Sequence, residues 1–306
     1  MIATYARNAP LQWKNRILAA YTTRLSRFAP LARLALIALL CAAPPDAMAQ
    51  SEARLRAHYV ATLIGITVGS GSWDVRIAPD HFIVTGNGGS SGLARLFSSG
   101  RAEAIAEGPI RNGKPAPQRY DYTSTTTKKF DEIHMRLAQN AVTELRIEPP
   151  QNRHRKRVPL EPQHQIGVLD PIAAVMLPTP GPLTPGPLTP GPLTPGQLGP
   201  ETCARNLPVF DGRMRYDLHF AFKRMEQVKT NTGYQGPVAV CAIRFTPIAG
   251  HVPERPAIKY LTELTTMEVW LAPVAGTSLA VPWKVIIPTP YGTGVLQAET
   301  FRVTAN

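Results

Sequence analysis

One short motif has the spacing of a serine nucleophile. Gly88-Gly-Ser-Ser-Gly92 matches the G-x-S-x-G pattern, in which the serine, here Ser90, stands on a sharp turn between a strand and a helix. His134 or His219 would have to supply the base, and an acid would have to orient it. The pattern belongs to parallel sheets of β–α units, which this sequence does not predict. We therefore interpret the segment as a Gly/Ser-rich turn.

Four charged residues occupy alternate positions of one apolar segment. They are Asp211, Arg213, Arg215 and Asp217. On an extended strand all four would share one face. They could then join neighbouring strands in a ladder of charge-assisted hydrogen bonds, or they could bind an anionic headgroup or polymer. Both interpretations stay open, and the ladder is the simpler one.

The histidines after residue 50 give no metal signature. None of them forms an i, i+4 pair, and no pair of cysteines lies near them. A phosphate-binding G-x-x-x-x-G-K loop is absent from the sequence as well. We expect no metal, no cofactor and no catalytic residue, and hence a non-enzymatic protein.

The N-terminal residues have the pattern of an export signal. Residues 1–45 contain Arg and Lys but no Asp or Glu, and an apolar run covers 34–43. An A-x-A site follows, so we expect cleavage near Ala49 and a periplasmic mature chain. An anchoring helix and a lipid attached to Cys41 are the alternatives.

Composition narrows the classes of partner. The chain has 306 residues and a formal charge of +12, but part of the excess of bases belongs to the N-terminal signal. An exported protein does not meet genomic DNA, so we expect no nucleic-acid partner. No 18-residue apolar run follows residue 50, so we expect no transmembrane helix in the mature chain. The oligomeric state is left open.

Two cysteines remain after cleavage, Cys203 and Cys241. In an oxidising compartment two thiols of one small domain usually pair, so we expect a disulfide. Two buried free thiols are the alternative. A C-x-x-C motif is absent, which argues against a thiol oxidoreductase.

The order of segments predicts one interrupted domain. Residues 1–49 are the signal peptide, and residues 50–150 form the N-terminal β half. Residues 151–200 hold a basic loop, a short helix at about 168–177 and a disordered Pro-rich linker of GPLTP repeats, in which repeated prolines exclude helix and central strand. Residues 201–306 form the C-terminal β half.

Two parts of this insertion could make contacts. The basic run Arg153–Arg157 is either a solvated loop or a contact for an anionic surface such as lipid headgroups. The repeats are a surface tether, or a ligand for an aromatic groove. Asp170, followed by Pro171, is expected to cap the short helix.

Both flanks of the insertion alternate between apolar and polar residues. Met214 to Phe222 is the clearest case, with an apolar residue at every second position. Such alternation predicts strands with one wet face. Short strands separated by glycine turns predict a mainly β fold, an antiparallel curved sheet or open half-barrel with one or two short helices. The expected strands are 54–63, 73–77, 82–85, 123–127, 130–137, 142–147, 214–222, 238–245, 267–271, 283–287 and 295–303.

The inward aromatic residues have two interpretations. They either fill the core or line a groove for an apolar ligand. The candidates for the groove are Tyr59, Trp73, Phe82, Tyr216, Phe220 and Phe222.

Several of these segments together resemble a known family. They are Tyr59 with Gly65–Gly69, the Asp170-Pro171 pair, Cys203, Phe210–Leu218, and the closing Val269-Trp270, Pro282 and Tyr291-Gly292. The resemblance is to the exported bacterial proteins catalogued as domain of unknown function 3108, over roughly residues 54–303. It implies an exported, mostly β protein and carries over no activity. The long strands also resemble the half-barrels of periplasmic lipid carriers, by analogy of fold alone.

These patterns predict a periplasmic, non-enzymatic protein that binds a hydrophobic or amphipathic envelope component. The concave face of the sheet would bury an acyl chain, and basic residues at its rim would meet an anionic head. The alternative is a structural or interaction protein of the envelope with a filled core. A serine hydrolase that uses Ser90 is a distant third.

Overall fold

The computed structural model describes residues 52–92, 99–180, 198–230 and 233–305. Residues Gln50–Asn306 form one compact unit. Residues 1–49 lie outside the described residues, as do the GPLTP repeats. The predicted signal peptide and linker are therefore left as sequence-based predictions.

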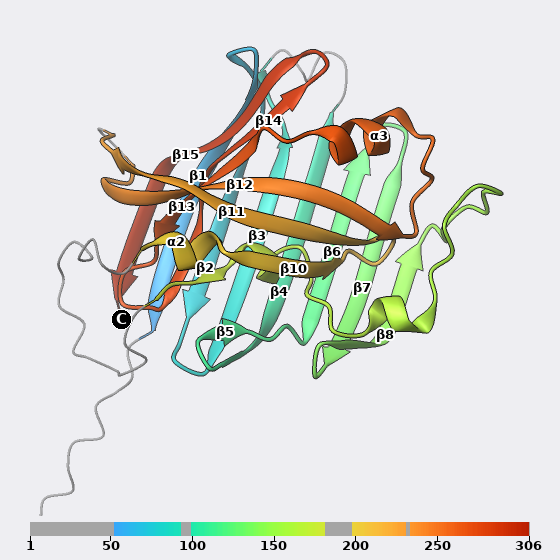
Figure 1. Ribbon diagram of the computed structural model, residues 1–306, viewed down its shortest axis with the longest axis horizontal. Coiled ribbons are helices and arrows are strands. Elements are labelled where there is room, and N and C mark those ends of the chain that lie inside the picture. Colours follow the sequence, from blue (N-terminus) through green and yellow to red (C-terminus); the bar gives the residue numbers. More distant parts are fainter. Residues whose placement is uncertain (1–51, 93–98, 181–197, 231–232, 306) are drawn as a thin grey trace, which may run out of the picture. The chain divides into compact units, whose positions relative to one another are not determined.

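The fold is one antiparallel sheet of fifteen strands that does not close into a barrel (Figure 1). The predicted mainly β class is therefore confirmed. The strand order is β10-β11-β12-β13-β14-β15-β1-β2-β3-β4-β6-β7-β8, with β5 beside β4 and β9 beside β14. The N-terminal strands are β1 (Ala53–Leu63), β2 (Ile66–Ile77), β3 (His81–Ser90), β4 (Gly100–Arg111), β5 (Lys114–Pro115), β6 (Arg119–Thr126), β7 (Phe130–Ala138) and β8 (Ala141–Glu148). The C-terminal strands are β9 (Leu177–Pro178), β10 (Arg205–Phe210), β11 (Arg215–Val228), β12 (Gly236–Ala249), β13 (Met267–Pro273), β14 (Leu279–Thr289) and β15 (Gly292–Ala305).

The first strand shows why the sequence takes this form. Leu55 and Tyr59 point into the core and are buried, whereas Arg54 lies on the wet face and donates to Asp74 of β2 at 2.5 Å. Strand β1 pairs with β15 along its length, from Ala53 opposite Ala305 to Leu63 opposite Gly294. The two halves of the chain therefore share one continuous sheet.

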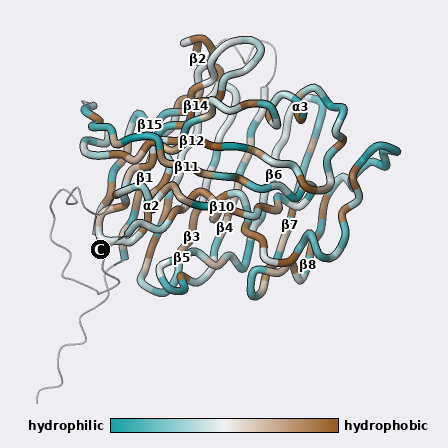
Figure 2. The backbone as a smooth tube through the Cα atoms, in the orientation of Figure 1, coloured by the Kyte–Doolittle hydropathy of each residue, from teal (hydrophilic) through white to brown (hydrophobic). Residues whose placement is uncertain are grey.

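The sheet folds over itself around a common core. Figure 1 shows β10, β11 and β12 running across the N-terminal strands. Phe210 of β10 packs in the same buried cluster as Phe82 of β3 and Met135 of β7, and all three are fully buried. A second cluster surrounds Cys203 and Phe220. Figure 2 shows hydrophobic and hydrophilic residues alternating along the strands that enclose these clusters.

A short segment spans the gap between the two edge strands. Ile166 forms a bridge with Ala141 of β8, and Leu169 forms a parallel bridge with Val209 of β10. The Val168 amide donates to the Asn140 carbonyl at 2.8 Å. Backbone groups at both edges are thereby satisfied, which protects edges that would otherwise invite further strands.

Helices are few and short in the part of the chain that the structure describes. The ten-residue helix predicted at about 168–177 is wrong in extent, because the chain there makes a single 3-10 turn and then enters β9. Asp170 does accept hydrogen bonds from the Ile172 and Ala173 amides, at 2.8 and 3.0 Å. No helix in the described part of the chain is long and apolar enough to cross a membrane. The helices are η2 (Pro162–Gln165), η3 (Ala173–Val175), α2 (Pro200–Cys203) and α3 (Pro256–Glu263).

Candidate functional site

The first three residues of the serine motif lie in a strand. Gly88, Gly89 and Ser90 belong to β3, which pairs antiparallel with β2 and β4, and Ser91 and Gly92 follow its end. The glycines allow close approach of the strands, since a Cβ on Gly71, opposite Gly88, would lie 2.4 Å from the Asn87 carbonyl oxygen. The Ser90 hydroxyl accepts a hydrogen bond from the Gly100 amide at 3.1 Å. The predicted turn is therefore wrong for Gly88, Gly89 and Ser90, and the antiparallel strand lacks the parallel-sheet context that a nucleophile elbow requires.

The four alternate charges divide into two pairs. Strand β11 begins only at Arg215, because Gly212 has φ of 92° and turns the chain before it. Asp211 caps that turn and accepts from the Arg213 and Met214 amides at 2.8 and 2.7 Å. Arg215 pairs with Asp217 at 2.7 Å. The expectation that all four share one strand face is therefore wrong.

Arg213 instead reaches another part of the sheet. Its guanidinium forms an ion pair with Asp131 of β7 and donates to the Pro149 carbonyl at 3.0 Å. The Arg215 guanidinium also donates to the Tyr216 carbonyl at 2.6 Å. Among these contacts the Arg213–Asp131 pair joins the turn between β10 and β11 to the distant strand β7. Arg215 and Asp217 are neighbours on the same strand.

One fully buried carboxyl group, Asp170, and one half-buried carboxyl group, Asp211, act on the same two tyrosines. Asp170 is fully buried, and burial raises its pKa to about 6. Burial also raises the pKa of Asp211. The charges of both residues act on Tyr120 and Tyr216 and add to the effect of burial in raising the pKa of each phenol. Two segments that carry the family resemblance, Asp170-Pro171 and Phe210–Leu218, therefore meet in one polar cluster inside the fold.

The six candidate groove residues do not line one groove. Tyr59 and Phe82 are buried in the main core, and Trp73 packs against it. Phe220 and Phe222 belong to the second cluster, whereas Tyr216 stacks near Phe245 with ring centroids 5.3 Å apart. Tyr59 also donates to the Pro282 carbonyl at 2.6 Å. These side chains are therefore occupied by contacts within the protein.

Cys203 and Cys241 form a disulfide. It joins α2, which follows the insertion, to β12 in the C-terminal half. The bond anchors the chain where it leaves the Pro-rich segment and returns to the sheet. Both sulfur atoms are buried with Phe220 in the second cluster, away from any candidate site.

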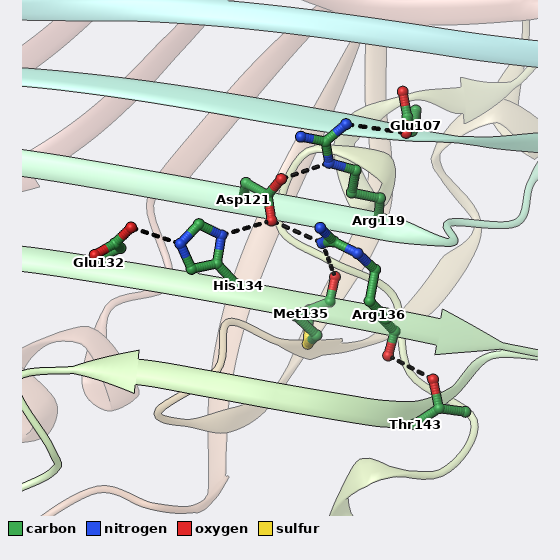
Figure 3. Close-up of polar contacts among 8 residues, drawn as sticks. All are labelled: Glu107, Arg119, Asp121, Glu132, His134, Met135, Arg136 and Thr143. Carbon is green, nitrogen blue, oxygen red and sulfur yellow. Dashed lines mark hydrogen bonds and ion pairs between the residues drawn. The ribbon is translucent and has the colours of Figure 1, made fainter.

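A charged network covers the wet face of β4, β6 and β7 (Figure 3). Asp121 lies at its centre and accepts hydrogen bonds from Arg119, from Arg136 at 2.7 Å and from His134 Nδ1 at 3.0 Å. The other ring nitrogen of His134 lies 2.5 Å from Glu132 Oε1. The imidazole of His134 thus lies between two carboxylates. The sequence did not predict this contact, because the register of β6 and β7 could not be deduced from it.

The hydrogen bonds of the network shift the pKa values of Asp121 and His134. Burial opposes the charged form of Asp121, but hydrogen bonds from Arg136, Arg119 and His134 outweigh it and lower the pKa to about 2. The hydrogen bonds to Glu132 and then Asp121 raise the pKa of His134. The two carboxylates therefore favour the cationic form of His134. This arrangement cross-links strands, and an imidazole with both nitrogens engaged is poorly placed to accept a proton from a substrate.

A basic pocket lies where the insertion meets the loop after β12. It is open, has a volume of about 510 Å³, and is bordered by two segments that are a hundred residues apart. The basic run supplies one wall, and the N-terminus of α3 supplies the other. Among the described lining residues Glu254 is the acid, and it is paired with Lys156 at 3.3 Å. The lining residues are His154, Arg155, Lys156, Val252, Glu254, Arg255 and Pro256.

Arg157 is the last residue of the basic run. It donates to the Gly250 carbonyl at 2.5 Å, and burial together with the charges of Arg255 and Arg213 lowers its pKa. The buried Nε atoms of Arg157 and Arg213 have no hydrogen-bond partner among the described residues, and neither has Nδ1 of His251, whose pKa is lowered by burial. Buried polar groups without partners are costly, and repulsion among the guanidinium groups adds to that cost.

This arrangement is suited to an anion. A phosphate or carboxylate would relieve the repulsion among the cations, and guanidinium groups bind such anions with paired hydrogen bonds. Helix α3 begins at Pro256, and the side chain of its N-cap residue, Arg255, makes no capping hydrogen bond. The positive end of the helix dipole therefore adds to the field at the pocket.

The fold and this site define a class of protein, an open antiparallel β-sheet with a basic surface pocket. The chain belongs to the family described as "Protein of unknown function (DUF3108)", whose model matches residues 55–299. The resemblance noted in the sequence is thereby confirmed. No curated protein matches the sequence.

The chain is also similar to a protein of known structure. That protein is the "Beta-barrel-like Protein of Domain of Unknown Function DUF1849 from Brucella abortus". The two share 8% identity over 82% of this chain and 98% of that chain, with a TM-score of 0.45.

Proposed function

We propose that this is an exported, non-enzymatic protein of the periplasm that binds an anionic, amphipathic component of the cell envelope. The observation that carries the proposal is the basic pocket, whose Arg255 also acts on the charge of the neighbouring Arg157. The run Arg153–Arg157 had two interpretations, a solvated loop or a contact for anionic headgroups. Its position against Arg255 and α3 favours the second.

The pocket would hold the head of the ligand. Arg155 and Arg255 would bind the anion. Lys156 would leave its ion pair with Glu254 and contact the anion instead, since exposed ion pairs are weak. Val252 and Pro256 offer apolar contact beside the charges. The aromatic groove predicted for an acyl chain is not part of this proposal, because five of those side chains pack in or against the two cores and Tyr216 packs against Phe245.

The experiment is a titration of the purified mature chain, residues 50–306, with dihexanoyl phosphatidylglycerol below its micellar concentration. Arg155→Gln together with Arg255→Gln should weaken binding at least tenfold, the effect of losing two charge-assisted contacts. The matched control is Arg111→Gln with Lys114→Gln, which removes two exposed charges from the β4–β5 hairpin. Equal binding by both double variants would contradict the proposal.

A structural or interaction protein of the envelope is the second candidate. The observation that favours it is the burial of Tyr59, Phe82 and Phe220, which fill cores that a carrier would leave open. The Pro-rich segment 178–200 would then be a contact point. Its deletion should reduce co-purification of envelope proteins without changing the melting temperature, whereas unchanged co-purification would argue against this candidate.

A further inference from the structure

Two hairpin tips meet at one end of the sheet. One joins β1 to β2 through Ile64-Gly65, and the other joins β14 to β15 through Pro290-Tyr291. The Ile64 amide donates to the Thr293 carbonyl at 3.0 Å. A Cβ added to Gly292 would lie 2.4 Å from Ile64 Cγ1, so the isoleucine rests directly on the neighbouring tip.

The joined tips expose large apolar side chains. Ile64 is 67% exposed and Tyr291 is 78% exposed, and Ile66, Ile287 and Leu296 are exposed beside them. The tip of the β1–β2 hairpin is coloured hydrophobic in Figure 2. A contiguous exposed apolar surface of this kind marks a contact with a partner or a membrane. We call these five residues the apolar tip.

The backbone at Ile64 makes the choice of residue unusual. Ile64 has φ of 52°, in the left-handed region that β-branched residues avoid. Two-residue hairpin turns of this form favour Asn-Gly, and the chain uses that solution at Asn112-Gly113, where Asn112 has the same φ. Apart from its contact with Gly292, a largely exposed isoleucine in a conformation that disfavours it adds little to the fold, which points to a role outside it.

The opposite end of the same strands is polar. Its turns are Pro79-Asp80, Asn112-Gly113 and Gln139-Asn140. The exception is Ile166, which is 66% exposed and lies beside Ala141. The two ends of the sheet therefore face different surroundings.

Charge is absent from the apolar tip. Residues 61–72 and 285–298 contain no Asp, Glu, Lys or Arg, in a chain in which 18% of residues are charged. The antiparallel pairing from β2 through β3, β4 and β6 to β7 places the β6–β7 turn at the same end of the sheet as the apolar tip. Phe130, which follows that turn, is 47% exposed, and Lys128 and Lys129 precede it. Uncharged aliphatic tips with an exposed tyrosine, and lysines to one side, match the order of a bilayer from its acyl chains to its headgroups.

We propose that the apolar tip inserts into the interfacial region of a lipid bilayer and docks the protein on a membrane surface. Ile64 and Ile66 would enter the acyl boundary, and the Tyr291 hydroxyl would lie among the headgroups. An insertion of roughly 5–10 Å, typical of interfacial anchors, equals about two or three residues of strand. The inference goes beyond ligand binding at the basic pocket, which lies on other segments.

The test is flotation of the mature chain with vesicles of phosphatidylcholine alone, which carry no net charge. The wild type should float with the vesicles. Ile64→Asn should lower partitioning about tenfold, the effect of removing one buried isoleucine. Since Asn suits a positive φ, this variant should melt no lower than the wild type. Ile166→Asn is the matched control at the other end of the sheet and should float as the wild type does.

Three results would overturn the proposal. The wild type would fail to float, or Ile64→Asn would float equally well. Alternatively, the wild type would sediment as a dimer that Ile64→Asn dissociates, which would make the tip a self-interface. The Arg155→Gln, Arg255→Gln variant should still float, because neutral vesicles do not require the basic pocket. Its failure to bind phosphatidylglycerol in solution is thus a separate result.

Discussion

Asp121 gives the sharpest test of the energetics, because three cationic groups converge on one carboxylate. Asp121→Asn keeps the shape of the side chain and removes its charge. The pKa of Asp121 falls from an ordinary 3.8 to about 2 in the folded protein. That difference corresponds to about 2 kcal/mol, and screening of the half-exposed partners reduces it to about 1 kcal/mol.

The sign of the pH dependence follows from the lowered pKa. The carboxylate stabilises the folded state above its unfolded pKa of about 3.9, and this contribution is lost as pH falls through about 2. The free energy of unfolding should therefore be lower in Asp121→Asn than in the wild type at pH 7, by about 1 kcal/mol. The difference should shrink below pH 4.

Urea unfolding from pH 7 to pH 2 measures this difference, and His134 reports on it independently. His134 would keep Glu132 but lose Asp121, so its raised pKa should fall in the variant when followed by NMR. Asp80→Asn is the control, since Asp80 also pairs with a histidine, His81, but is far more exposed. A difference in stability that stays constant down to pH 2 would refute the reasoning.

Two further substitutions test the interior. Ionisation of the buried Asp170 carboxyl destabilises the folded state, so the free energy of unfolding of the wild type should fall as pH rises through about 6. Asp170→Asn should remove this fall, and urea unfolding at a series of pH values measures it. The amide should still accept from Ile172 and Ala173, and an unchanged pH profile would contradict this account. Replacing Cys203 and Cys241 by Ser should lower the free energy of unfolding by about 3–4 kcal/mol for a bond across 38 positions, measured by urea titration; a loss below 1 kcal/mol would contradict it.

Local sequence patterns predicted most of the strands but not which strands pair with one another. The alternation from Met214 to Phe222 located β11, although the strand begins at Arg215. Strand β4 was missed because Gly100–Arg111 is rich in Ala and Glu, which are poor strand formers, and its pairing with β3 and β6 overrides that preference. The helix predicted at about 168–177 was too long, because η3 ends at Val175 and β9 begins at Leu177.

The candidate sites are formed by residues that lie far apart in the sequence or on different strands, so the sequence alone did not predict them. The basic run at 153–157 was visible, but its partner at 252–256 lies a hundred residues further on. Likewise Asp121 and His134 meet only because β6 and β7 pair in one register. One signal was available and missed: Asp211-Gly212 is a typical turn pair, which should have divided the four alternate charges.

The basic pocket is the central claim, and native mass spectrometry of the mature chain purified from periplasm without detergent tests it most directly. The account predicts a retained mass that dissociates as an anionic, amphipathic molecule from the wild type. The mass should be absent from the Arg155→Gln, Arg255→Gln variant and present in the Arg111→Gln, Lys114→Gln control. A clean unliganded mass for the wild type, or the same retained mass in all three proteins, would contradict it.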